Sequence, residues 1–269
     1  MPGSVHPTSE RDVVLEVRAL TKRFGGLVAV DHVSFHAHQH EILSIIGPNG
    51  AGKSTIFKLM TGAHRPTSGR VLFEGKDITG QPAHLVARQG VVRTFQETTI
   101  FREMTARENV VIAHHLRARA TAVGILLNSP RARGEAAAFR ESADEILEYL
   151  GLGRVKHERA RSLPHGHLRG LGIAIALAAD PKVLLLDEPF TGMHTEETDR
   201  AVEMVRGIRD RGVTVLLVEH DIRAVMRISD RIIVLNFGRM IAEGPPRQIQ
   251  RDEAVIEAYL GREDEALGV

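Results

Sequence analysis

The sequence contains no cysteine and no tryptophan among its 269 residues. Without cysteine it has no disulfide scaffold, no thiolate metal site and no cysteine nucleophile. Its 35 basic and 34 acidic residues nearly cancel, which gives no support for broad nucleic-acid binding. No apolar run approaches the ~18 residues of a membrane span, and the polar N-terminal segment lacks the apolar core of a signal peptide. We therefore expect a soluble, cytoplasmic protein with no membrane span of its own.

Apolar runs alternate with helical patterns over much of the chain. Buried strands are predicted at Glu41–Ile46, Val183–Leu186, Val213–Val218 and Arg231–Leu235. A half-buried strand is predicted at Val33–Ala37, and a loosely alternating one at Val14–Ala19. Helices are predicted over Lys53–Met60 and Glu196–Asp210. Strands that alternate with helices are typical of a mainly parallel α/β sheet.

The middle of the chain differs from its two ends. Residues 97–180 are rich in Ala, Arg, Glu and Leu at helical spacing and predict a helical subdomain. A loop is expected over Gly124–Gly134, and a helix over Leu168–Ala178. One domain is therefore predicted, in which residues 1–96 and 181–269 form the α/β core around the helical insertion.

A glycine-rich segment between a predicted strand and a predicted helix matches the phosphate-loop pattern GxxxxGK[ST]. The segment and the residue after it are Gly47, Pro48, Asn49, Gly50, Ala51, Gly52, Lys53, Ser54 and Thr55. Glycine lets such a loop turn its N–H groups inward around phosphate oxygens. Lys53 is expected to neutralise β- and γ-phosphate oxygens, Ser54 to offer its hydroxyl to Mg²⁺, and Thr55 to support the neighbouring phosphate. An ordinary glycine-rich turn is the alternative, but the strand–helix context favours a nucleotide site.

Two acids follow the predicted strand at Val183–Leu186. Ligands of open α/β sheets bind at the carboxyl ends of the strands. Asp187 is therefore expected to hold Mg²⁺ through its water shell, and Glu188 to polarise an attacking water. An acidic turn without function is the alternative.

Two further polar residues complete the predicted catalytic set. Gln96 follows a short apolar segment, and its amide is expected to reach Mg²⁺ and the attacking water. His220 follows the strand at Val213–Val218 and is expected to donate to the γ-phosphate. A crowded group of histidines, His32, His36, His38 and His40, suits a solvated strand face better than a metal site, because no acid completes a ligand set.

These motifs occur in the order and approximate spacing found in ABC-transporter ATPase subunits, which the chain resembles from about Leu15 to Gly261. The phosphate loop, Phe95-Gln96, Leu163–Gly166, Val183–Pro189, Gly192 and His220 carry the resemblance. More narrowly, the chain is similar to the ATP-binding subunits of branched-chain amino acid importers. The narrower likeness lies in Leu20–Val30, Arg93–Gln96, Thr191–Met193 and Ile256–Gly261.

The resemblance implies a P-loop ATPase core of mainly parallel sheet and helices, with a small N-terminal antiparallel β part and an inserted helical subdomain. It implies that Phe24 stacks on adenine, although a core Phe in a strand is the alternative. It also implies a head-to-tail dimer with a second ATPase subunit, identical or different. In that dimer each ATP lies between one subunit's phosphate loop and the other's signature loop. Closure of the dimer at the inner face of the membrane would drive transmembrane permease subunits. An extracytoplasmic solute-binding protein would deliver the solute to these subunits.

The sequence departs from the family pattern at two places. The signature segment, usually close to Leu-Ser-Gly-Gly-Gln, here consists of Leu163, Pro164, His165, Gly166 and His167. Pro164 has neither hydroxyl nor N–H, so contacts in trans are expected to be weaker, with His165 and His167 as replacement donors. The following D-loop consists of Thr191, Gly192, Met193 and His194, and His194 cannot offer the usual carboxylate or amide.

The departures suggest that this subunit pairs with a different ATPase subunit and keeps the competent site on its own phosphate loop. Other functions remain open from the sequence. They are an exporter of the lipopolysaccharide type, a urea or amide importer, an ABC ATPase that acts outside transport, and a regulatory module that binds ATP without turnover.

Overall fold

The computed structural model describes residues 13–94, 100–114 and 129–266. The chain forms two compact units, one from residues 1–83 and 185–269 and the other from residues 84–184. The sequence places residues 1–96 and 181–269 with the α/β core, whereas the described residues 84–94 and 181–184 belong to the second unit. Within that unit the N–H groups of Lys182 and Val183 both donate to the carbonyl of Gly90.

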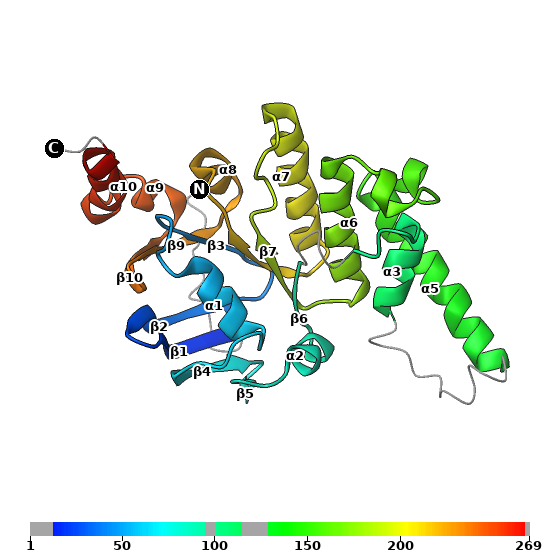
Figure 1. The fold of residues 1–269 in the computed structure, drawn as a ribbon, viewed down its shortest axis with the longest axis horizontal. Helices are drawn as coiled ribbons and strands as arrows, with labels where there is room; N and C mark the ends of the chain where they lie inside the picture. Colours follow the sequence, from blue (N-terminus) through cyan, green and yellow to red (C-terminus); the bar gives the residue numbers. More distant parts are fainter. Residues whose placement is uncertain (1–12, 95–99, 115–128, 267–269) are drawn as a thin grey trace, which may run out of the picture. The chain divides into compact units, whose positions relative to one another are not determined.

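The N-terminal part of the first unit is a small antiparallel sheet (Figure 1). Its strands are β1 (Val13–Phe24), β2 (Leu27–His38), β4 (Ser68–Phe73) and β5 (Lys76–Asp77), in the order β2-β1-β4-β5. Val33, Phe35 and Ala37 of β2 are buried, which confirms the predicted alternation. β1 continues beyond the predicted end at Ala19, because register shifts and a left-handed Ala19 let the strand pass the break in its pattern.

A second, mainly parallel sheet carries the phosphate loop. In the first unit its strands are β3 (Ile42–Ile46), β8 (Thr214–Val218), β9 (Arg231–Asn236), β10 (Arg239–Gly244) and the end of β7 (Val183–Asp187). They lie in the order β10-β9-β3-β8-β7. β3 pairs in parallel with both neighbours and β10 is antiparallel to β9. Every residue of β3 and β8 is buried, as expected of central strands.

The described part of the first unit contains five helices. They are α1 (Lys53–Met60), α7 (Thr195–Asp210), α8 (Ile222–Ile228), α9 (Pro246–Ile249) and α10 (Glu253–Ala266). α1 has the bounds predicted from the sequence, and α7 begins one residue before its predicted start. Together the two sheets and their helices confirm the predicted fold class.

A buried ion-pair group fixes the start of β9. The Arg231 guanidinium donates to Glu41 at 2.7 and 3.0 Å and to the carbonyl of His36 at 2.6 Å. It also pairs with Glu243 of β10. Removing Arg231 would leave the 8% exposed Glu41 without this partner, and such breaks typically cost about 3–5 kcal/mol.

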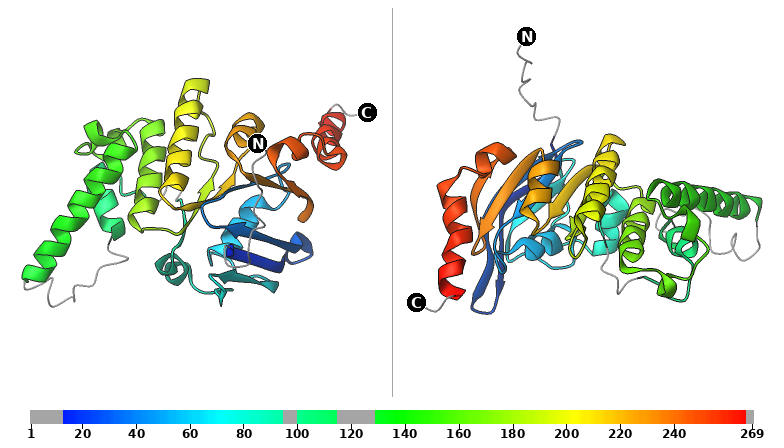
Figure 2. Two further views of the ribbon diagram at one scale, coloured as in Figure 1. Left: turned by 180° about the vertical axis from the view of Figure 1, so that it is seen from behind. Right: turned by 90° about the horizontal axis from the view of Figure 1, so that it is seen from above.

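The second unit is mostly helical. Its elements are α2 (Ala83–Gln89), β6 (Val91–Arg93), α3 (Ala106–His114), α5 (Pro130–Tyr149), α6 (His165–Ala178) and two 3₁₀ turns at Gly153–Val155 and Ala160–Ser162. α3, α5 and α6 lie side by side (Figure 2). Their buried apolar side chains form a shared cluster. No helix in the described part of the chain is long and apolar enough to cross a membrane.

Two expectations for the helical unit are wrong in detail. α5 begins at Pro130, inside the predicted loop Gly124–Gly134, because proline is well tolerated in the first turn of a helix. α6 begins at His165, three residues before the predicted start. Pro164 lies just before the helix as its N-cap, where its missing N–H costs nothing, and its carbonyl accepts from Leu168 N at 3.0 Å.

Candidate nucleotide site

The phosphate loop runs from the end of β3 into α1. Gly47, Gly50 and Gly52 all have positive φ. A Cβ on Gly47 would lie 2.1 Å from the carbonyl oxygen of Leu235, and one on Gly52 would lie 2.5 Å from that of Ala29. A Cβ on Gly50, by contrast, would meet nothing within 4 Å. The close packing below the loop therefore requires glycine at two positions and leaves Gly50 on an open side.

Lys53 is the first residue of α1, at the end of this loop. Its side chain is only 5% exposed, and Nζ donates to the carbonyls of Gly47 at 2.6 Å and Pro48 at 3.0 Å. The first turn of α1 contains no acidic residue, so its partial positive charge is not opposed there. Ser54 and Thr55 follow, both half-buried. An ammonium group and the N-terminus of a helix are features that bind phosphate.

The carboxyl ends of β3, β8 and β7 lie at one edge of the sheet. β3 and β8 are parallel, with Ile45 opposite Val218, and the N–H of Glu188 donates to the carbonyl of Val218 at 2.8 Å. Asp187 is half-buried at the end of β7. The phosphate loop, the acidic pair and the His220 loop therefore leave neighbouring strands.

Glu188 and His220 contact each other. His220 Nε2 lies 2.8 Å from Glu188 Oε1, and both side chains are about two-fifths exposed. Glu188 has a φ of +52°, a left-handed conformation that is costly for a residue with a Cβ. The structure thus brings together two of the three predicted catalytic side chains. The third, Gln96, and its neighbour Phe95 lie outside the described residues.

One buried acid in this region was missed by the sequence reasoning. Glu219 is 1% exposed and accepts hydrogen bonds from the N–H groups of Phe190, His220 and Asp221. Burial raises the pKa of its carboxyl above the usual range, the charge of Glu188 adds to the shift, and the three N–H donors oppose it. An acid directly after a fully buried strand and before His220 is the signal that could have found it.

The segment after Glu188 turns sharply into α7. Thr191 N donates to the carbonyl of Glu188 at 3.4 Å and Met193 N to that of Phe190 at 3.2 Å, with Gly192 at a φ of +75°. His194 is the N-cap of α7, and its N–H donates to Glu197 Oε2 at 3.0 Å. Thr191, Gly192 and His194 are exposed, so this loop presents its polar groups at the surface.

Phe24 ends β1 with 44% of its surface exposed, so it is not a core residue. Its ring meets His64 edge-on at 5.7 Å, and Lys22 Nζ lies 4.8 Å from the ring centroid. An exposed aromatic face beside a cation can stack on a planar ligand.

The signature segment belongs to the second unit. Leu163 is buried, Pro164, His165 and Gly166 are exposed, and His167 is half-buried. Because α6 begins at His165, the N–H of Gly166 lies in the first helical turn, where N–H groups have no partner within the helix. The helix therefore starts within the signature segment itself.

The histidine group of β2 makes local contacts. His36 Nε2 lies 3.1 Å from His38 Nε2, and His32 Nδ1 lies 2.7 Å from Asp31. Among the described residues no three or more His, Asp or Glu side chains are grouped so as to hold a metal ion.

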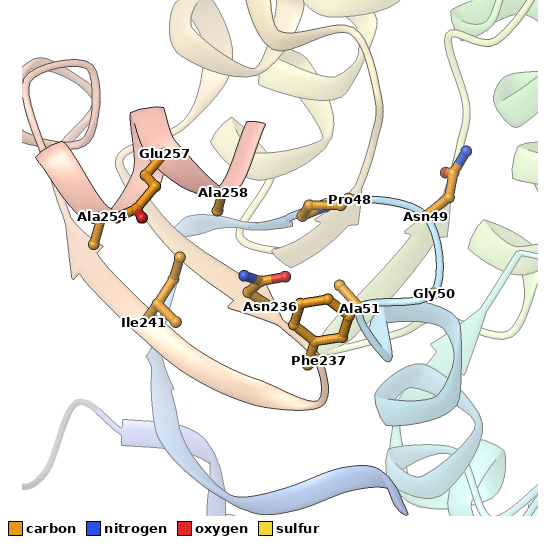
Figure 3. A pocket seen from close by; sticks show the side chains of 10 residues that line it. All are labelled: Pro48, Asn49, Gly50, Ala51, Asn236, Phe237, Ile241, Ala254, Glu257 and Ala258. Atoms are coloured by element: carbon orange, nitrogen blue, oxygen red, sulfur yellow. The ribbon is translucent and has the colours of Figure 1, made fainter. Parts of the chain in front are cut away.

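A cavity of about 570 Å³ adjoins the outer side of the phosphate loop (Figure 3). It is lined by Pro48, Asn49, Gly50, Ala51, Asn236, Phe237, Ile241, Ala254, Glu257 and Ala258. Nearby on α10, burial raises the pKa of Tyr259 to about 12, opposed by a hydrogen bond with the backbone of Gly47. Tyr259 also packs against the apolar cluster that contains Ile46. The C-terminal helix thus supports the start of the loop.

Residues 30–191, which make up more than half of the chain, match the ABC transporter family. The chain belongs to the ABC transporter family. As a member it is an ATPase whose cassette binds ATP and ADP. Residues 239–265 additionally match the family described as branched-chain amino acid ATP-binding cassette transporter.

Curated relatives of this ABC protein align over nearly their whole length. The high-affinity branched-chain amino acid transport ATP-binding protein BraF of Pseudomonas aeruginosa is 43% identical over 249 residues, which cover 92% of this chain and 98% of BraF. The corresponding protein LivG of Escherichia coli K12 is 42% identical over the same shares. The lipopolysaccharide export ATP-binding protein LptB of Haemophilus influenzae is 33% identical.

Solved ABC cassettes share the fold. A nucleotide-free ATP-binding cassette has a TM-score of 0.81 at 31% identity, and covers 92% of this chain and 98% of its own. A cassette in its ADP conformation has a TM-score of 0.80 at 30% identity, with 93% and 99% covered. These likenesses confirm the predicted ABC ATPase fold.

Proposed function

We propose that this chain is the ATP-hydrolysing subunit of an importer for branched-chain or other hydrophobic amino acids. The observation that carries the proposal is the 43% identity to a branched-chain amino acid transport ATP-binding protein over 98% of that relative. The C-terminal match at residues 239–265 supports the same substrate class. The subunit acts at the inner face of the plasma membrane with permease subunits and a second ATPase subunit. An extracytoplasmic solute-binding protein supplies the amino acid.

The nucleotide binds with its phosphates at the loop from Gly47 to Thr55 and its adenine at Phe24. Lys53, held against two loop carbonyls, places an ammonium group against the β- and γ-phosphates. The N–H groups of the loop and of α1 add donors without needing a basic surface. Exposure of the Phe24 ring supports its part in stacking.

Mg²⁺ fits the donors at the edge of the sheet, because it prefers oxygen ligands and retains part of its water shell. The Ser54 hydroxyl, the Gln96 amide oxygen and, through water, Asp187 are the residues that would hold it. The metal would offset phosphate charge during hydrolysis. Glu188 polarises the attacking water, and His220, within 2.8 Å of Glu188, donates to the γ-phosphate.

The signature segment and the D-loop act on the second subunit. Leu163, Pro164, His165, Gly166 and His167 face the partner's nucleotide, and Thr191, Gly192, Met193 and His194 link the two sites. Pro164 cannot donate to a phosphate, so the site completed by this segment is the weaker one. Hydrolysis that drives transport then depends on Glu188 of this subunit, paired with the partner's signature loop.

Transporters reconstituted in liposomes with one altered ATPase subunit at a time test this proposal. Glu188→Gln in this subunit is expected to reduce ATP-dependent leucine uptake by about 10²-fold or more, because general-base help contributes about 10²–10⁴-fold. The matching change in the second subunit should reduce uptake less. Glu203→Gln, an exposed glutamate of α7 that pairs with Arg206, is the control.

Two outcomes would contradict the proposal. Intact uptake with Glu188→Gln would remove Glu188 from its role in the competent site. ATP hydrolysis that no branched-chain amino acid stimulates, in a complex that instead moves lipopolysaccharide, would favour the export function suggested by the 33% identity to LptB.

A further inference from the structure

Glu219 occupies a position between the two loops that carry the proposed catalytic side chains. It directly follows β8, precedes His220, and is 1% exposed. Its carboxylate accepts hydrogen bonds from three backbone N–H groups of the protein. The question is why a buried acid lies at this place.

The carboxylate joins the two loops. Oε1 accepts from Phe190 N at 2.5 Å, two residues after Glu188. Oε2 accepts from His220 N at 2.8 Å and from Asp221 N at 3.4 Å. One side chain thereby fixes the backbone on both sides of the contact between Glu188 and His220.

Keeping a charge here is costly. Desolvation disfavours the carboxylate, and the nearby negative charge of Glu188 disfavours it further. A neutral side chain of the same size would avoid both costs. The three N–H donors compensate only in part, so stability alone does not explain an acid at this position.

The backbone of Glu188 needs contacts with other residues to keep its conformation. Glu188 is held at a φ of +52°, and non-glycine residues stay in this region only where surrounding contacts enforce it. The bond from Glu188 N to the carbonyl of Val218 holds one side of the residue. The bond from Phe190 N to Glu219 holds the other side.

We propose that Glu219 is a positioning residue that locks the Glu188 loop and the His220 loop into one unit, so that the two side chains stay in contact during hydrolysis. The inference rests on the proposed roles of Glu188 and His220. It assigns Glu219 to the rate of hydrolysis rather than to the binding of ATP.

Neither glutamine nor aspartate can replace Glu219 with the same hydrogen bonds. Glutamine has one acceptor oxygen, and its NH₂ group would face N–H donors on one side. Aspartate keeps the charge but is one methylene shorter and cannot span both loops as before. Both changes should loosen the loops, and misplacement by about 1 Å can cost about 10²-fold in rate.

The test compares three purified transporter complexes, each with its permease and second ATPase subunits, that carry wild type, Glu219→Gln or Glu219→Asp in this chain. For Glu219→Gln we expect kcat for ATP hydrolysis to fall by about 10- to 100-fold while KM for ATP changes by less than about 3-fold. Amide hydrogen exchange should accelerate at Phe190 and His220 and remain unchanged in α1. Glu219→Asp should lie between the two on both measurements. If Glu219→Gln fails to fold, the Asp variant decides by the same measurements.

Glu108→Gln is the matched control. Glu108 also accepts a backbone N–H, from Thr105, but it is exposed and belongs to the second unit. The inference is overturned if kcat stays within about 2-fold of wild type, if exchange at Phe190 and His220 does not change, or if KM and kcat are lost together. Glu188→Gln measured in parallel separates the two proposals. Undiminished hydrolysis there defeats the proposed function, whereas the exchange measurement still judges Glu219.

Discussion

Lys53 is unusual among the lysines of this protein because its ammonium group is buried. Two carbonyls of its own loop hold Nζ, so little side-chain freedom remains to be lost when a phosphate binds. Glu188 and Glu219 also have little freedom left to lose. Glu188 is held in a left-handed backbone conformation, and the Glu219 carboxylate is buried. At the scale of single residues, the site is already ordered by contacts within the protein.

Lys53→Ala is expected to bring ATP hydrolysis to background and to weaken ATP binding by more than about 10-fold. The reason is that hydrogen bonds to charged groups contribute about 1.5–3 kcal/mol each, and the variant also loses the only positive side chain of the loop. Isothermal titration and phosphate release measure the two effects.

The control for this change is Lys58→Ala, which removes a lysine from the same helix, on its last turn. It should leave both quantities within about 2-fold of wild type. Hydrolysis above half the wild-type rate in Lys53→Ala would disprove the role of Lys53.

At the scale of elements, apolar runs and the phosphate-loop spacing predict many of the strands and helices. β3, β7, β8, β9 and α1 follow directly from continuous apolar segments or from the phosphate-loop pattern. β1 was predicted too short because a bulged strand breaks the two-residue period on which the prediction depends. Glu219 was missed because a single acid after a strand has no spacing pattern, and its three backbone contacts exist only in the folded chain.

The start of α6 shows most clearly how an element can differ from its prediction. The sequence predicts that this helix begins at Leu168, whereas it begins at His165 with Pro164 as an N-cap that makes no side-chain hydrogen bond. Ser at this position would supply an oxygen that accepts from an N–H of the first turn. We therefore expect Pro164→Ser to be more stable than Pro164→Ala by about 1 kcal/mol in the free energy of unfolding.

Urea denaturation followed by circular dichroism measures this difference. Comparing Ser with Ala removes the effect of losing proline from the unfolded chain, since both variants lose it. Equal stabilities would show that the helix start is satisfied in another way.

At the scale of the whole molecule, the chain forms a discontinuous α/β unit and a continuous helical one. The helical unit has its own apolar cluster, which includes the fully buried Ala106, Val110, Ala143, Leu147 and Leu171. About 100 residues with such a cluster lie in the size range of domains that fold alone.

A fragment of residues 84–184 is therefore expected to fold by itself, with a helical circular dichroism spectrum and a cooperative thermal transition. Leu147→Ala in the same fragment should lower its free energy of unfolding by about 2–5 kcal/mol, because it empties a fully buried position. A non-cooperative transition, or one that Leu147→Ala leaves unchanged, would show that the cluster does not form alone.

The discontinuity of the α/β unit also determines when the phosphate loop can be completed during synthesis. The hydroxyl of Thr214 donates to the carbonyl of His38 across 176 positions of sequence, and β3 pairs with β8 over a similar span. A ribosome adds about 5–20 residues per second, so β3 waits on the order of ten seconds for its partners β8 and β9. During that interval the apolar β3 has no strand beside it, and unpaired strand edges of this kind are prone to aggregation.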